Sequence, residues 1–144
     1  MTEADTVIRK PLAATAEKAY VIDSFAWFEY FLGSHAGTKA KPFIEAGSGL
    51  TPTIVIAKLA DKYTRERMSF SDKLSFILLR TQDVGLDVAL ARKAGALNEE
   101  RKRIAKRWGL ADSIVLATAR AHNAKIITGD EHFRDLDDEV IMIK

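Results

Sequence analysis

The chain has 144 residues, 47% of them hydrophobic, and contains no cysteine. This size and apolar content suit one domain with an ordinary core, and the lack of cysteine excludes thiol nucleophiles, zinc–thiolate sites and disulfide frameworks. The formal net charge is only +2, and no run of about 18 apolar residues could span a membrane. A cytoplasmic location is therefore expected.

Residues 1–18 carry Arg9 and Lys10 but no apolar segment typical of a signal peptide. No repeat, linker or low-complexity tract divides the rest of the chain. We therefore predict a loosely held N-terminal arm over residues 1–18 and one domain over residues 19–144.

Apolar runs, helix caps and turn residues predict the elements of the first half of the chain. Residues 19–23 form an apolar run typical of a buried strand, and Ser24 can cap the helix that follows, which would end at Gly33. Next come a short helix at 38–46, a brief strand at Leu50 and Thr51, and a helix that has Pro52 in its first turn and ends near Arg67.

The second half alternates helices and strands in the same way. Its predicted elements are a helix from Ser69 or Ser71 with an apolar stripe of Leu74, Ile77 and Leu78, a strand from Val84 to Leu86, a helix capped by Asp87 that ends near Trp108 before Gly109, a buried helix from Ala111 to His122, and strands at 124–128 and 139–143. Because such alternation requires parallel crossovers, the predicted fold is α/β, a three-layer α/β/α sandwich with a mainly parallel central sheet.

Three aspartates lie where apolar elements begin or end. Asp23 and Asp130 each follow a predicted strand, and Asp112 lies near the start of the buried helix. In open α/β sheets, sites form at the carboxyl ends of the strands, so these carboxylates are expected to share a metal-binding cleft. Each also has an ordinary structural explanation, since aspartate stabilises helix starts and is common in turns.

Other polar and aromatic groups give less definite signals. The basic clusters could contact phosphates or form solvated helix faces, the aromatic residues fit a core or a dimer face better than a base-stacking platform, and no histidine is predicted to bind metal. The basic clusters are Lys62, Arg65 and Arg67, and Arg101, Lys102, Arg103, Lys106 and Arg107; the aromatic residues are Phe25, Trp27, Phe28, Tyr30 and Phe31; the histidines are His35, His122 and His132.

Three segments resemble the signature segments of PIN domains, and the likeness is greatest to VapC-type toxins. They are Val21-Ile22-Asp23-Ser24, Gly109-Leu110-Ala111-Asp112-Ser113 and Ile127-Thr128-Gly129-Asp130-Glu131-His132-Phe133, in the family order. The resemblance covers residues 19–144. It implies a metal-dependent ribonuclease in which four acidic residues hold Mg²⁺ or Mn²⁺, and it assigns three of them to Asp23, Asp112 and Asp130.

The fourth acidic residue of the family is missing. The segment Thr53-Ile54-Val55-Ile56-Ala57-Lys58-Leu59-Ala60 resembles the one that carries the family's glutamate, but it has Lys58 at that position. Asp61, one helical turn further on, could face the same way. A catalytic role is also considered for Thr128, whose hydroxyl lies two residues before Asp130. The resemblance therefore implies an impaired enzyme, and the alternative is a catalytically silent PIN-fold module that binds a protein partner or RNA.

The resemblance also implies partners. They are an RNA substrate, a cognate antitoxin whose basic tail enters the acidic cleft, and a second copy of the chain. The apolar residues Phe28, Tyr30, Phe31 and Leu32 would contribute to the homodimer interface.

Two other protein classes fit the sequence less well. A haloacid-type phosphatase needs a second carboxylate where Phe25 stands, and a receiver domain needs a lysine at the end of a late strand, where only Lys144 is available.

Overall fold

The computed structural model describes residues 18–144, so the predicted N-terminal arm lies almost wholly outside the described residues. Helices and strands alternate along the chain, as predicted. The strands are β1 (Tyr20–Ile22), β2 (Gly49–Pro52), β3 (Gln82–Val84), β4 (Lys125–Thr128) and β5 (Val140–Met142); the helices are α2 (Ser24–Leu32), α3 (His35–Glu45), α4 (Thr53–Arg65), α5 (Ser71–Arg80), α6 (Val88–Lys102) and α7 (Leu110–Ala121), with a short 3₁₀ helix, η2 (Glu131–Phe133).

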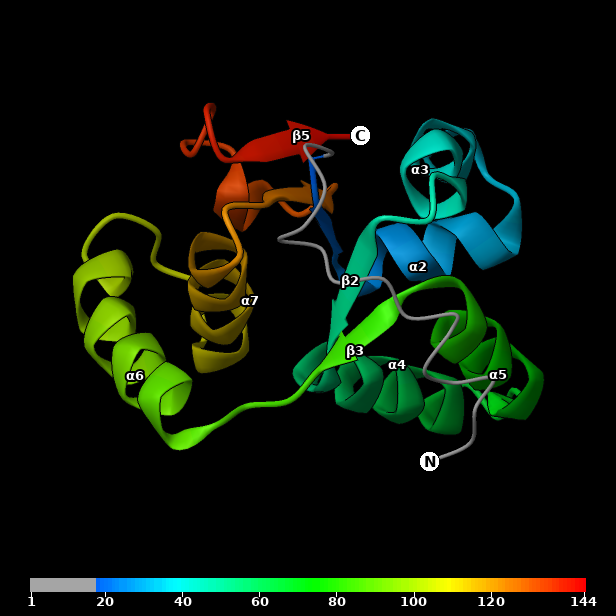
Figure 1. The fold of residues 1–144 in the computed structure, drawn as a ribbon, viewed down its shortest axis with the longest axis horizontal. Coiled ribbons are helices and arrows are strands. Elements are labelled where there is room, and N and C mark those ends of the chain that lie inside the picture. Colours follow the sequence, from blue (N-terminus) through cyan, green and yellow to red (C-terminus); the bar gives the residue numbers. More distant parts are fainter. Residues whose placement is uncertain (1–17) are drawn as a thin grey trace.

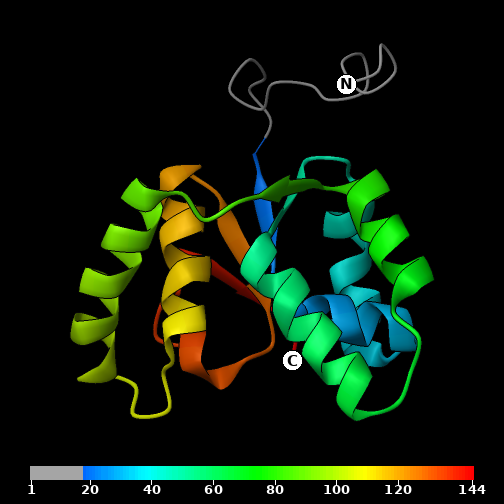
Figure 2. The same ribbon diagram turned by 90° about the horizontal axis from the view of Figure 1, so that it is seen from below.

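The strands form one fully parallel sheet in the order β3-β2-β1-β4-β5. In Figure 1, α6 and α7 lie on one side of this sheet and α2 and α3 on the other, which gives the predicted α/β/α sandwich. Figure 2 shows α4 between α7 and α2 in the view from below. Because the strands are parallel, the loops that follow β1, β2 and β4 all leave the same edge of the sheet.

The core is built from the apolar faces that the sequence indicated. Val55, Leu59 and Tyr63 are spaced four residues apart on α4, and all three are buried. Helix α7 is buried over most of its length, as its apolar composition predicted. Between α2 and α3 the approach is so close that a Cβ on Gly37 would collide with the backbone of Glu29, which explains the glycine at this position.

Three local predictions need correction. The helix capped by Asp87 ends at Lys102, well short of Trp108, because the chain turns there and brings the Trp108 ring against Phe133 at 4.9 Å between centroids. The strand near Val84 lies at 82–84, slightly earlier than predicted. The predicted apolar stripe of α5 is only partly internal, since Leu78 is exposed whereas Ile77 is buried.

The caps of the early helices also differ slightly from the predictions. Ser24 is the first residue of α2 and Asp23 occupies the N-cap position, where its side chain makes no capping hydrogen bond. Pro52 precedes α4 as its N-cap rather than lying in its first turn. The cap at Asp87 is confirmed, since its carboxylate accepts from the N–H of Leu90 at 2.8 Å. Among residues 18–144, no helix combines the length and the apolar character needed to cross a bilayer.

Candidate metal centre

The predicted site residues come to the carboxyl edge of the sheet from four different elements. Asp23 follows β1 and Asp130 follows β4, and these two strands are neighbours in the sheet. Asp112 is the third residue of α7, and Lys58 lies in the second turn of α4. Residues far apart in the sequence thus meet where a parallel sheet ordinarily forms its site.

Asp23 is the most enclosed of these groups, with only 1% of its surface exposed. The Thr128 hydroxyl donates to its Oδ2 at 2.7 Å, whereas its Oδ1 is buried and has no hydrogen-bond partner. Burial raises the pKa of this carboxyl, an effect that the nearby Lys58 ammonium and the Thr128 hydrogen bond oppose. A buried carboxylate oxygen without a donor costs free energy unless a ligand satisfies it.

Asp112 is also buried and makes three polar contacts. Its Oδ2 accepts from the backbone N–H of Gly109 at 2.9 Å and lies 3.1 Å from Nδ1 of His132. Its Oδ1 lies 4.0 Å from the ammonium of Lys58. The carboxylate therefore caps the start of α7, which agrees with the ordinary structural role of an aspartate at a helix start. It faces the cleft as well.

Asp130 completes the cluster from the loop after β4. Its N–H donates to the Thr128 hydroxyl at 3.0 Å, and its Oδ1 accepts from the N–H of His132 at 3.0 Å. The same Oδ1 lies 3.4 Å from Nδ1 of His132. One ligand atom each from Asp112, Asp130 and His132 all lie within 4.8 Å of one another.

The structure thus places His132, which the sequence did not assign to the site, between two of the predicted aspartates. The feature of the sequence that could have indicated this position is that His132 follows Asp130 by two residues, on the same loop. Asp23 is not one of this close group of three, but it is near enough for the charges of Lys58 and Asp112 to act on it. Asp61 lies at the edge of the cleft, where its exposed carboxylate pairs with Arg65 at 3.0 Å.

For the cluster that contains Arg101, the sequence left open phosphate contacts or a solvated helix face, and Arg101 fits neither. It is 3% exposed, whereas the other four members of its cluster are exposed or lie beyond the helix on the surface. Its guanidinium donates to both oxygens of Asp135, at 2.7 and 2.9 Å, and to the carbonyl of His132 at 3.1 Å, and it lies 4.3 Å from the centroid of the Trp108 ring. These contacts fix the loop that carries Asp130 and His132.

A hollow of about 270 Å³ opens beside the acidic cluster. It brings aromatic rings and basic side chains of α2 and α4 next to Asp130, and its lining residues are Ser24, Phe25, Phe28, Glu29, Lys58, Leu59, Asp61, Lys62, Arg65 and Asp130. A Cβ on Gly129 would collide with the Phe25 ring, so glycine is needed where this ring meets the loop after β4. Of the three predicted aspartates, Asp130 alone lines this hollow, together with Lys58.

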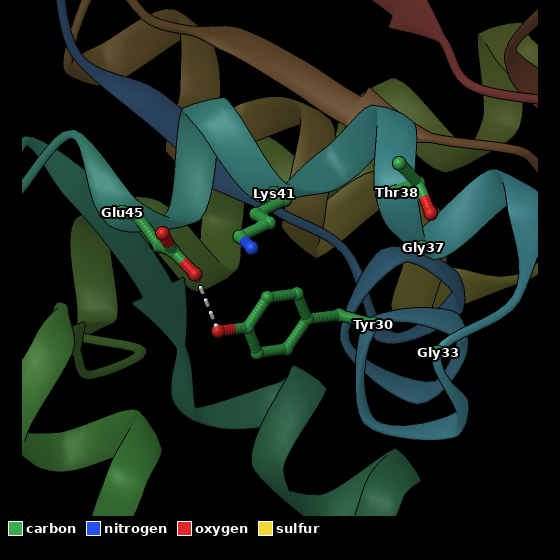
Figure 3. Close-up of a pocket in the computed structure, with 6 residues that line it drawn as sticks. All are labelled: Tyr30, Gly33, Gly37, Thr38, Lys41 and Glu45. Carbon is green, nitrogen blue, oxygen red and sulfur yellow. Dashed lines mark hydrogen bonds between the residues drawn. The ribbon is translucent and has the colours of Figure 1, made fainter.

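A second hollow, of about 330 Å³, lies between α2 and α3 (Figure 3). In it the Tyr30 hydroxyl donates to Glu45 at 2.9 Å, and burial together with this hydrogen bond raises the pKa of Tyr30. Lys41 and Thr38 complete its polar lining. None of the five predicted site residues lines it, so it is not part of the acidic site.

The donor set fits a hard divalent cation. Carboxylate oxygens are the ligands that Mg²⁺ and Mn²⁺ prefer, and the orphaned Oδ1 of Asp23 is an oxygen that such an ion or its water shell would satisfy. Lys58 opposes this fit, because its ammonium already places a positive charge 4.0 Å from Asp112. The site therefore contains the acidic residues that a cation needs. It also contains Lys58, whose ammonium competes with a cation for Asp112.

A five-stranded parallel sheet with acidic residues at its carboxyl edge defines an α/β protein with a candidate metal centre. Residues 20–139 match the family model described as PIN domain, and the chain belongs to that family. No curated protein matches the chain significantly.

Solved structures share the fold at low sequence identity. A toxin–antitoxin complex from Klebsiella pneumoniae is similar with a TM-score of 0.68 and 19% identity, over 88% of this chain and 98% of that one. VapC20 from Mycobacterium tuberculosis, a toxin that cleaves the sarcin–ricin loop, is similar with a TM-score of 0.65 and 11% identity, over 82% and 95%. VapBC2 from Rickettsia felis bound to a promoter DNA fragment is similar with a TM-score of 0.64 and 16% identity, over 85% of this chain and 96% of that one.

Proposed function

We propose that this chain is a VapC-like ribonuclease toxin whose activity depends on Mg²⁺ or Mn²⁺ and is impaired by Lys58. One observation carries the proposal: Asp112 and Asp130 converge beside buried Asp23 at the edge of the sheet, with Lys58 against Asp112. The toxins among the structures of similar fold, one of which cleaves the sarcin–ricin loop, support the substrate class.

Each side chain has a defined task in this proposal. Asp23, Asp112 and Asp130 hold the cation, and Thr128 fixes both Asp23 and the backbone of Asp130 through its hydroxyl. A cation held by these residues would supply an activated water for attack on phosphorus and would neutralise charge on the leaving oxygen. The hollow beside Asp130 would receive the RNA strand, with Lys62 and Arg65 at its rim near the phosphates.

Lys58 weakens this arrangement by its charge. An ammonium in place of the family's glutamate changes the local charge by two units, and two unit charges about 4 Å apart interact by about 4 kcal/mol at an effective dielectric of about 20. Water reaches Lys58, whose side chain is 35% exposed, so the net effect is smaller. The residual charge still competes with a divalent cation for Asp112.

The test is the variant Lys58→Glu. We expect it to raise Mg²⁺- or Mn²⁺-dependent cleavage of a fluorogenic RNA at least about tenfold, equivalent to about 1.4 kcal/mol of barrier. EDTA should abolish the gain. Lys93→Glu, at an exposed position of α6, makes the same change of charge away from the site and should leave cleavage unchanged.

Two other results have distinct meanings. Equal cleavage by the parent and the Lys58→Glu variant would mean that Lys58 does not occupy the glutamate position, or that Asp61 substitutes for it. No cleavage by either would favour the silent binding module, in which the Lys58–Asp112 pair replaces the metal and the cleft only binds a partner or RNA.

The proposal extends to partners and compartment. A cognate antitoxin would insert an arginine among the carboxylates, since a guanidinium matches a carboxylate with two hydrogen bonds. A homodimer would cover apolar surface such as Leu32, which is 55% exposed. Sedimentation that detects only monomers at tens of micromolar would contradict the dimer. The cytoplasm, where RNA and antitoxin are met, is the compartment that we propose.

A further inference from the structure

His132 faces the two carboxylates that are closest together in the candidate metal centre. Its Nδ1 lies 3.1 Å from Oδ2 of Asp112 and 3.4 Å from Oδ1 of Asp130. Two ligands of one ion, each about 2.1 Å from it, lie up to about 4.2 Å apart. Since the three ligand atoms lie within 4.8 Å of one another, their spacing is already close to that of a shared cation.

The backbone of His132 is held from two sides, which directs its ring into the cleft. Its N–H donates to Asp130 at 3.0 Å, and its carbonyl accepts from buried Arg101 at 3.1 Å. Arg101 is itself fixed by Asp135 and by the Trp108 ring. A ligand on a fixed backbone loses little conformational freedom when it binds, so this support favours an imidazole with a defined role.

An independent observation points to a ligand at this edge of the sheet. Asp23 is 1% exposed, and its Oδ1 has no hydrogen-bond partner. This carboxylate is close enough to Asp112 and Lys58 for their charges to act on it. This edge of the sheet therefore contains a buried oxygen that nothing among the described residues satisfies, on a carboxylate that shares the Thr128 hydroxyl with the backbone of Asp130.

We propose that His132 is a direct metal ligand through Nδ1 and that it makes the site prefer Mn²⁺ to Mg²⁺. The inference rests on the proposed metal-dependent function and specifies its ligand set. Both ions prefer oxygen, but Mn²⁺, as a first-row transition-metal ion, accepts an imidazole nitrogen more readily than Mg²⁺, which is bound through oxygen and keeps several waters. A site of carboxylates plus one imidazole therefore discriminates between the two ions through His132.

The competing explanation is that His132 only orients Asp112 and Asp130 through hydrogen bonds. In that case its loss would weaken the binding of both ions to the same degree, and no nitrogen would contact the metal. If His132 is a direct ligand, the bound Mn²⁺ gives a nitrogen signal, and removal of His132 lowers the affinity for Mn²⁺ much more than that for Mg²⁺. The two explanations thus differ in a spectroscopic property and in a ratio of affinities.

The experiment uses the full chain with Lys58→Glu, which removes the competing ammonium, and compares it with the same chain that also carries His132→Ala. Mn²⁺ binding is measured by electron paramagnetic resonance, Mg²⁺ binding by competition with Mn²⁺, and coordination by the ¹⁴N modulation of the Mn²⁺ spin echo. His122→Ala, at the exposed far end of α7, is the matched control. Circular dichroism verifies that each variant is folded.

We expect ¹⁴N modulation in the Lys58→Glu chain and in its His122→Ala control, and none with His132→Ala. The affinity for Mn²⁺ should fall at least about tenfold with His132→Ala, and that for Mg²⁺ less than about threefold. Absent modulation, or an equal loss for both ions, overturns the ligand role of His132. If cleavage still rises with Lys58→Glu, only this inference fails; if the chain binds neither ion, the metal-dependent function fails with it.

Discussion

Arg101 and Asp23 are both buried charged side chains, but the fold pairs one and leaves the other incomplete. Arg101 meets both oxygens of Asp135, a backbone carbonyl and an aromatic ring, and only its Nε is without a partner. Asp23 has one side-chain hydrogen bond, from Thr128, and an unsatisfied oxygen. A buried charge that is well paired is structural, whereas one left open is suited to a ligand.

The largest effect expected from this comparison concerns Asp135. Asp135→Ala leaves the buried guanidinium of Arg101 without its carboxylate. Because the Asp135 side chain is itself 44% exposed, we expect a loss of about 2–3 kcal/mol of unfolding free energy, less than for a pair buried on both sides. Urea unfolding followed by circular dichroism measures the loss. The exposed Asp138→Ala variant is the control and should lie within about 0.5 kcal/mol of the parent. A loss below about 1 kcal/mol would show that Arg101 is not held by this pair.

The second prediction concerns Asp23→Asn, which we expect to increase the free energy of unfolding rather than decrease it. Asp23→Asn keeps an oxygen for Thr128 and removes the buried charge, so the variant should be more stable than the parent by about 1–2 kcal/mol near pH 7. The metal binding that we propose for Asp23 should be lost in the same variant. A destabilised Asp23→Asn variant would mean that the carboxylate is already satisfied in the folded chain.

The pH dependence of that gain follows from the raised pKa of Asp23. The folded chain holds the proton of this carboxyl more tightly than the unfolded chain does, so its contribution to stability is fully present below the ordinary value of 3.8 and is lost as the pH rises through the higher pKa of the folded state. The advantage of Asp23→Asn should therefore shrink as the pH falls toward about 4. Parallel urea titrations at both pH values check this.

The smallest effect is expected at Arg120 and Glu139, which form the same forked contact as Arg101 and Asp135 but near the surface. Their hydrogen bonds are 2.7 and 3.0 Å long, and the Arg120 side chain is 47% exposed. Glu139→Gln should cost only about 0.2–1 kcal/mol, less in high salt. Arg120 lowers the pKa of Glu139, so this small contribution is lost as the pH falls below the ordinary value of 4.5.

The sequence predicted the fold closely because its signals were local. The order of helices and strands followed from apolar runs, from Gly33 and from the cap at Asp87. The errors arose where tertiary contacts override the pattern. Arg101 lies in a strongly basic stretch, which suggested solvent exposure. In the fold it is buried and pairs with Asp135, and no periodicity of the sequence predicts that contact.

The site was only partly accessible from the sequence. The three aspartates could be named because each lies where an apolar element begins or ends, and Thr128 because it lies two residues before Asp130. Lys58 could be named from the resemblance to the family. His132 could not, since a histidine in a turn has no distinguishing pattern until the fold places it against Asp112. The unpaired oxygen of Asp23 likewise depends on burial, which is a property of the packed molecule.

The hydrogen bond from Thr128 to Asp23 joins residues 105 positions apart in the sequence. Closing so long a loop is slow relative to forming a helix, so the acidic centre is assembled late in folding. During synthesis, Asp23 remains without this partner until the segment of β4 has left the ribosome and paired with β1. A chain whose β4 segment has not yet emerged is therefore expected to lack the assembled acidic centre.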